Sequence, residues 1–113
     1  MINQKVYDAL KELARTESIF TYRQLNEKCN LGLDWSGDSD RNKIGEILGD
    51  ISKEEVKNGR PMISVLVNNA MTTMPGDGFF KLAEELEIKK PEESDVEFRA
   101  KEVKRVFTYW RDK

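Results

Sequence analysis

The pattern of apolar and polar positions predicts two amphipathic helices at the start of the chain. Residues 3–15 carry apolar side chains at intervals of three and four, with charged residues between them. The expected buried positions of this helix are Val6, Leu10, Leu13 and Ala14. A short extended segment should follow at Ile19 and Phe20. Thr21 and Gln24 then have the spacing of a capping box, which predicts a second helix running to about Cys29.

A third, longer helix is expected over about residues 41–58, after a loop rich in turn-forming residues. Its apolar stripe comprises Ile44, Ile47, Leu48, Ile51 and Val56. Ser52 and Glu55 repeat the capping-box spacing inside this stretch, which predicts a kink or a break near residue 51. Gly59 and Pro61 should end the helix.

The stretch from Gly59 to Phe80 predicts a β-hairpin. The β-branched run over residues 63–67 is typical of a buried strand. The Pro-Gly-Asp-Gly sequence at residues 75–78 has the composition of a turn, and an aromatic pair follows it. We therefore expect a hairpin with a long tip.

The C-terminal quarter predicts a short helix over residues 81–88, a charged linker over residues 89–93 and a last helix capped by Ser94 or Asp95. The apolar stripe expected on the last helix comprises Val96, Ala100, Val103, Phe107 and Trp110.

Composition narrows the classes of function. The 113 residues hold 19 Lys and Arg against 21 Asp and Glu, so the formal net charge is −2 and the strongly basic character of many nucleic-acid binders is absent. There is no histidine, which removes imidazole bases and histidine metal ligands. We expect no catalytic activity, no cofactor and no metal site.

The compartment is also predicted from composition. Cys29 is the only cysteine, so no disulfide can form within the chain. No apolar run approaches the length of a membrane span, and the first residues lack the apolar core of a secretory signal. These features predict a cytoplasmic protein that does not enter a membrane.

Three helices followed by a hairpin resemble the order of a winged helix-turn-helix domain, an α+β fold in which the hairpin is the wing. The Phe-Thr-Tyr-Arg-Gln-Leu sequence at residues 20–25 and the Pro-Gly-x-Gly-Phe sequence at residues 75–79 are similar, more narrowly, to the DNA-binding domain of alkyltransferase-like proteins. The Pro-Cys-His-Arg motif of that family is missing, because Pro61 is followed here by Met62, Ile63 and Ser64. The resemblance implies a non-catalytic DNA reader. On this basis residues 1–88 would form the winged-helix domain, and residues 89–113 a linker and a helix packed on it or forming a dimer contact.

Binding of double-stranded DNA, as a small prokaryotic transcriptional regulator or accessory factor, is the first hypothesis. A winged helix places its third helix in the major groove and its wing on the neighbouring backbone. The expected contacts are Arg41, Lys43, Lys53, Lys57, Arg60, Asn68, Asn69, Thr72 and Thr73. Acidic residues of the same helix, namely Glu46, Asp50, Glu54 and Glu55, would repel phosphate if they share its exposed face. Separation of the lysines from these acids would favour DNA, and mixing would favour a protein partner.

A protein-interaction module is the alternative, because an acidic domain suits a protein partner better than DNA. The expected contacts are Met71 and Met74 in the hairpin tip, and Val106, Tyr109 and Trp110 on the last helix. The last helix can either pack on the core of its own domain or form a homodimer.

Overall fold

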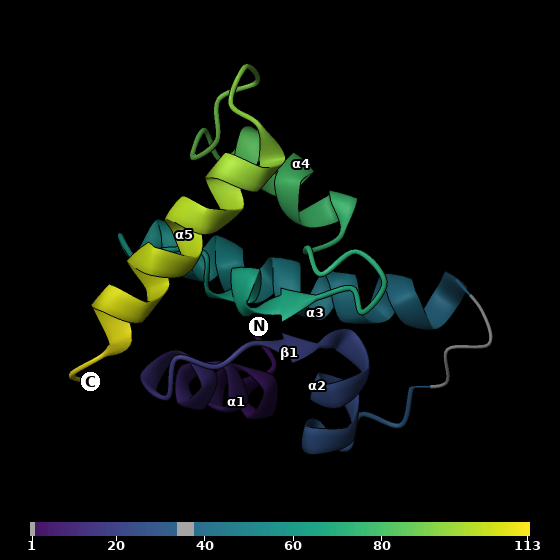
Figure 1. Ribbon diagram of the computed structural model, residues 1–113. Helices are drawn as coiled ribbons and strands as arrows, with labels where there is room; N and C mark the ends of the chain where they lie inside the picture. The colour runs from purple at the N-terminus through teal and green to yellow at the C-terminus, as the bar shows by residue number, and fades with distance from the viewer. Residues whose placement is uncertain (1, 34–37) are drawn as a thin grey trace.

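The computed structural model describes residues 2–33 and 38–113, and the side chains of residues 38–41 lie outside the described part. Five α-helices, one 3-10 helix and a two-stranded parallel sheet make up this part of the chain, so the fold class is α+β (Figure 1). The elements in order are α1 (Gln4–Arg15), β1 (Phe20–Thr21), α2 (Tyr22–Cys29), α3 (Asp38–Lys57), the 3-10 helix η1 (Ile63–Leu66), β2 (Val67–Asn68), α4 (Asp77–Glu85) and α5 (Asp95–Trp110).

The two N-terminal helices begin and end where local sequence chemistry predicts. The side chain of Asn3 accepts the Val6 N–H at the start of α1. At the start of α2 the capping box is complete, because the Gln24 N–H donates to Thr21 Oγ1 and the Thr21 N–H donates to Gln24 Oε1. Asn30 ends α2 in the left-handed conformation with φ 54°.

Helix α3 runs without a break through residue 51, so of the kink or break expected there the break is wrong. The side chains of Ser52 and Glu55 do not cap the backbone, because both are buried and bonded to distant residues. Ser52 Oγ lies 2.6 Å from Ser64 Oγ, and Glu55 accepts hydrogen bonds from Tyr7 and Arg60. The helix ends as predicted at Gly59, which has a positive φ of 74°.

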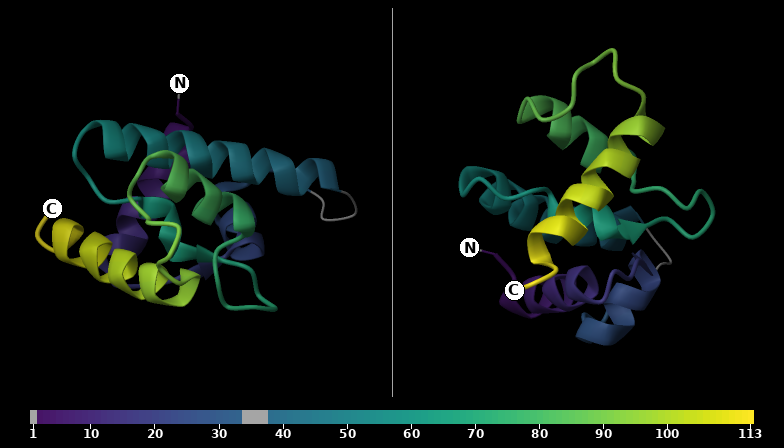
Figure 2. Two further views of the ribbon diagram at one scale, coloured as in Figure 1. Left: turned by 90° about the horizontal axis from the view of Figure 1, so that it is seen from above. Right: turned by 60° about the vertical axis from the view of Figure 1, so that its left-hand side comes forward.

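The predicted β-hairpin over residues 59–80 is wrong. Residues 63–66 form η1, and β2 pairs in parallel with β1, with Val67 opposite Phe20 and Asn68 opposite Thr21. The aromatic pair lies in α4, which begins after Gly76. Every residue from Pro61 to Asn68 is buried, and η1 contacts α1, α3 and α5 (Figure 2). The apolar run is therefore a central core segment rather than one arm of a surface hairpin.

The core has two parts, and α5 contributes to both. The larger cluster joins α1, α2, α3, η1 and the end of α5, while a smaller cluster comprises Met62, Phe80, Leu82, Ala83 and Phe98. The predicted stripe of α5 is confirmed in part, because Trp110 is buried and Val103 and Phe107 pack against the larger cluster. Val96 is 67% exposed, and the other buried positions are Phe98, Glu102 and Val106. The periodicity of apolar residues did not predict the whole buried face of α5, because one of its buried positions is Glu102.

Within the described ranges, none of the helices is both long enough and apolar enough to cross a membrane. Cys29 is 1% exposed, and its burial raises the pKa of the thiol above the ordinary value. Cys29 is therefore a core residue of α2.

Candidate binding surfaces

The exposed face of α3 carries acids and bases in one row. Lys43, Glu46, Asp50, Lys53 and Lys57 follow one another at steps of three or four residues, and all five are exposed. Residues at these steps are neighbours on a helix surface. The lysines proposed for DNA contact therefore share one exposed row with two carboxylates, which is the mixed arrangement.

Arg41 and Arg60, which were also expected to contact DNA, are not among the five residues of this row. The side chain of Arg41 lies outside the described residues. Arg60 is partly buried, and its Nε donates to Glu55 Oε1 at 2.8 Å. Its guanidinium therefore belongs to a pair with a buried carboxylate and does not extend the row on α3.

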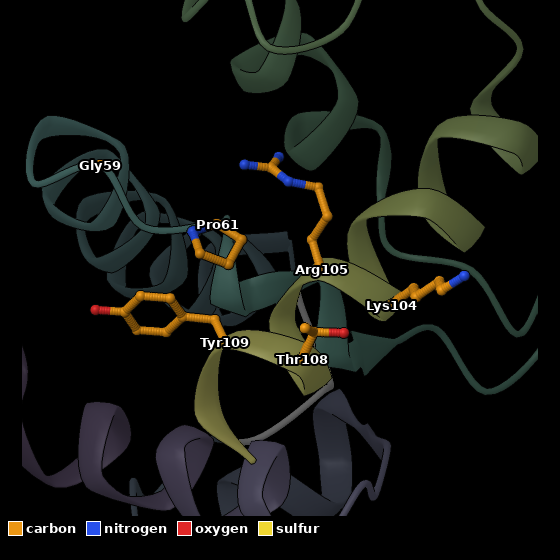
Figure 3. Close-up of a pocket in the computed structure, with 6 residues that line it drawn as sticks. All are labelled: Gly59, Pro61, Lys104, Arg105, Thr108 and Tyr109. Carbon is orange, nitrogen blue, oxygen red and sulfur yellow. The ribbon is translucent and has the colours of Figure 1, made fainter. Parts of the chain in front are cut away.

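A cleft of about 380 Å³ lies between the turn after α3 and the C-terminal half of α5. Gly59 and Pro61 line one side of it, and side chains of α5 project from the other side (Figure 3). The lining residues of α5 are Lys104, Arg105, Thr108 and Tyr109. The cleft thus combines two cations, a hydroxyl group and an aromatic ring, with no acid among its lining residues.

The carboxylates that pair with Arg105 and Arg60 are both buried. Glu102 is fully buried, where its Oε2 accepts the Met62 N–H at 2.9 Å and its Oε1 accepts from Arg105 at 2.6 Å. Glu55 is 1% exposed and accepts from the Tyr7 hydroxyl at 2.6 Å. Burial of Tyr7, and then the hydrogen bond to Glu55, raise the pKa of its phenol well above the ordinary value.

A second, smaller pocket of about 230 Å³ lies where β1 and β2 end. It is lined by Ile19, Phe20, Thr21, Asn68, Asn69, Ala70 and Thr73, none of which is charged. Asn68 is 6% exposed, and its Oδ1 is buried with no hydrogen-bond partner among the described residues. Buried polar atoms in native proteins are nearly always paired, so Asn68 Oδ1 is a candidate acceptor for a donor that enters the pocket.

The loop over residues 69–76 forms one wall of this pocket and projects from the body of the molecule (Figure 2). Its shape is fixed by hydrogen bonds: the Asn69 N–H donates to the Met74 carbonyl, and the Thr73 N–H donates to the Asn69 carbonyl, both at 2.8 Å. The Gly76 N–H donates to the Tyr22 hydroxyl at 2.6 Å, which ties the end of the loop to α2. Thr72 is exposed at the tip and bonds only within the loop.

The residues predicted as a protein interface separate into exposed and buried groups. Met71 is 92% exposed, whereas Met74 packs against the smaller core cluster. On α5, Val106 is fully buried, Trp110 is 7% exposed and Tyr109 is partly buried at the cleft. Val106 and Trp110 are therefore core residues of this chain, and Met71 is the exposed apolar side chain of the set.

Sequence reasoning did not anticipate either pocket. The smaller pocket forms because β1 pairs with β2, which lies 47 residues later in the chain and brings Thr21 opposite Asn68. No local pattern in the sequence predicts that pairing. Lys104 and Arg105 are two of many charged residues in the sequence of α5, and no local pattern distinguishes them as binding residues. The one local signal was the Gly-Arg-Pro sequence at residues 59–61, which predicts a turn with a basic side chain beside the helix end.

Comparisons with protein-family models, curated proteins and solved structures found no match. The geometry of the two pockets is therefore the basis for proposing a function.

Proposed function

We propose that this chain is a non-catalytic protein-interaction module that binds an extended, uncharged segment of a partner protein at the Asn68 pocket. In this proposal α1, α2 and α3 keep the helix order of a winged helix-turn-helix, and the loop over residues 69–76 takes the place of the wing. The observation that carries it is the buried, unpaired Oδ1 of Asn68 in a pocket without charged lining residues.

A peptide fits this site better than an anion does. Asn68 Oδ1 accepts hydrogen bonds, and the backbone N–H of an extended peptide is a donor of matching size. Ile19 and Phe20 offer apolar contact inside the pocket. Met71 lies on the loop that walls the pocket, and its flexible thioether can pack against a partner's apolar side chain.

Exposed apolar side chains support the same location. Among the described residues the large apolar side chains that are exposed are Ile19, Met71 and Val96. Ile19 lines the pocket and Met71 lies on its loop, so two of the three belong to one surface. Apolar exposure gathered around a pocket is typical of an interaction site.

Double-stranded DNA binding through α3 has less support. The exposed row on that helix contains Glu46 and Asp50 as well as lysines, so a phosphate backbone would be repelled by part of the row. Asn68, assigned to DNA contact, is buried in the pocket and lies too deep for a duplex.

Selection of peptides from a displayed random library, followed by fluorescence anisotropy of a labelled selected peptide, tests the proposal. We expect micromolar binders rich in uncharged apolar residues. Met71→Asp should weaken binding about tenfold, since burying an unpaired charge is costly. Val96→Asp introduces the same charge at another exposed apolar position and is the matched control, with binding unchanged.

Asn68→Leu separates binding from folding. Replacing a buried, unpaired amide by an apolar group of similar size should leave the protein at least as stable, while the hydrogen bond to the peptide is lost. Equal weakening by Met71→Asp and Val96→Asp, or a library that yields no binder, would contradict the proposal.

A further inference from the structure

The cleft between α5 and the turn after α3 is a separate surface, and its chemistry differs from that of the Asn68 pocket. We propose that it binds the phosphate groups of single-stranded nucleic acid. The inference does not rest on the peptide-binding proposal, because the two pockets share no lining residue.

The first argument is the sign of the accessible charge. Lys104 is exposed and Arg105 is 48% exposed, and both line the cleft. Arg60 lies between the lining residues Gly59 and Pro61, and Lys113 Nζ lies 4.7 Å from the centre of the Tyr109 ring. Two cations therefore line the opening, and Lys113 lies against the ring of the lining residue Tyr109.

The second argument is the position of the acids. Glu55 and Glu102 are the carboxylates bonded to Arg60 and Arg105, and both are buried. A negatively charged ligand approaching from solvent meets the cations first, while the carboxylates hold the two guanidinium groups in place. A charge-assisted hydrogen bond of this kind orients an arginine for an anion on its free side.

The third argument concerns the rest of the ligand. Pro61 and the ring of Tyr109 present apolar surface beside the cations (Figure 3). A nucleotide has a phosphate for the cations and a flat base for an apolar or aromatic wall. The cleft is open to solvent along its length, which suits a strand lying across it. A duplex keeps its bases stacked inside and would touch only the rim.

Fluorescence anisotropy of labelled oligothymidylate, titrated with the full chain at two salt concentrations, is the decisive measurement. The wild-type protein should bind, and binding should weaken steeply as salt rises. Lys104→Glu/Lys113→Glu should weaken binding at low salt by about tenfold or more, because two phosphate-facing cations become anions. Circular dichroism establishes that each variant is folded.

The double variant Lys53→Glu/Lys57→Glu is the matched control, because it changes the net charge by the same amount on the face of α3. Its affinity for the strand should stay within about threefold of the wild type, a loss expected from net charge alone. If it weakens binding as much as the cleft variant, or if the wild type does not bind at low salt, the assignment of the cleft is overturned.

Competitors identify what the cleft recognises. Unlabelled oligothymidylate should displace the labelled strand at far lower concentration than thymidine monophosphate, inorganic phosphate or a duplex of equal length. If inorganic phosphate or the monophosphate displaces the labelled strand at the same concentration as unlabelled oligothymidylate, the proposed recognition of a strand is overturned. The cleft would then be a simple anion site. Preferential displacement by the duplex would overturn the single-strand assignment.

Discussion

Helices α3 and α5 are both rich in charge, yet they present different surfaces. On α3 the lysines and the carboxylates are exposed together in one row. On the C-terminal half of α5 the cations Lys104 and Arg105 are exposed, while Glu102 is fully buried. The difference shows that the charge of a surface depends on which residues the fold buries, and that the composition of a helix does not determine it.

Each helix buries one glutamate, and the two are held differently. Glu102 uses both oxygens, one for the Met62 N–H and one for Arg105. Glu55 Oε1 accepts hydrogen bonds from both Tyr7 and Arg60, and Glu55 Oε2 is buried without a partner among the described residues. Glu102 is therefore the better-satisfied carboxylate, and its removal should disturb the protein more.

The largest expected effect comes from Glu102→Ala. The change leaves the Met62 N–H unpaired in the core and creates a cavity, so the free energy of unfolding should fall by about 2–4 kcal/mol. Urea denaturation followed by circular dichroism measures it. Lys104→Ala, on the exposed side of the same helix, is the control and should change stability by less than about 0.5 kcal/mol. Similar losses in the two variants would contradict the role given to Glu102.

Tyr7→Phe should have a smaller effect. The variant keeps the ring, which packs edge-on against Trp110 with centroids 6.3 Å apart, and removes only the hydroxyl that donates to Glu55. A buried hydrogen bond to a charged acceptor contributes about 1.5–3 kcal/mol, so a loss near the lower end is expected because Arg60 still pairs with Glu55. The measurement is urea denaturation at neutral pH, and an unchanged midpoint would show that the hydroxyl contributes nothing.

The same tyrosine predicts a pH dependence. Its pKa is raised in the folded protein, so the stability linked to it is present below the ordinary tyrosine pKa of about 10 and is lost as the pH rises above that value. Denaturation midpoints across this alkaline range should therefore fall more steeply for the wild type than for Tyr7→Phe. Parallel curves for the two proteins would contradict the raised pKa.

The smallest effect is expected at an exposed pair near the start of α5. Lys101 Nζ donates to Glu93 Oε2 at 2.6 Å, and this hydrogen bond lowers the pKa of the Glu93 carboxyl. Lys101→Met should return that pKa toward the ordinary glutamate value without a measurable change in the urea midpoint, since exposed pairs contribute little. Carboxyl chemical shifts followed by NMR across acidic pH measure it. An unaltered Glu93 pKa would show that the pair does not persist in solution.

Local signals in the sequence were sufficient for the first two helices, but they suggested a break in α3 that the structure does not have. The Thr21 and Gln24 capping box, the apolar stripe of α1 and the end of α3 at Gly59 were predicted because each depends on residues within one turn of helix. The hairpin failed because a β-branched run is equally compatible with a buried 3-10 segment and a strand. The predicted stripe of α5 was right at Trp110 and missed Glu102, because periodicity treats a glutamate as a surface residue.

The binding surfaces were decided by tertiary structure. The sequence by itself determined the limits of α1 and α2, the lack of histidine chemistry and the near balance of charge. Only the fold brought Ile19 beside Asn68, placed Glu102 under Arg105 and set Pro61 against Tyr109. The physical reason is that capping and periodicity act over a few residues, whereas burial and charge presentation depend on contacts between segments far apart in the chain.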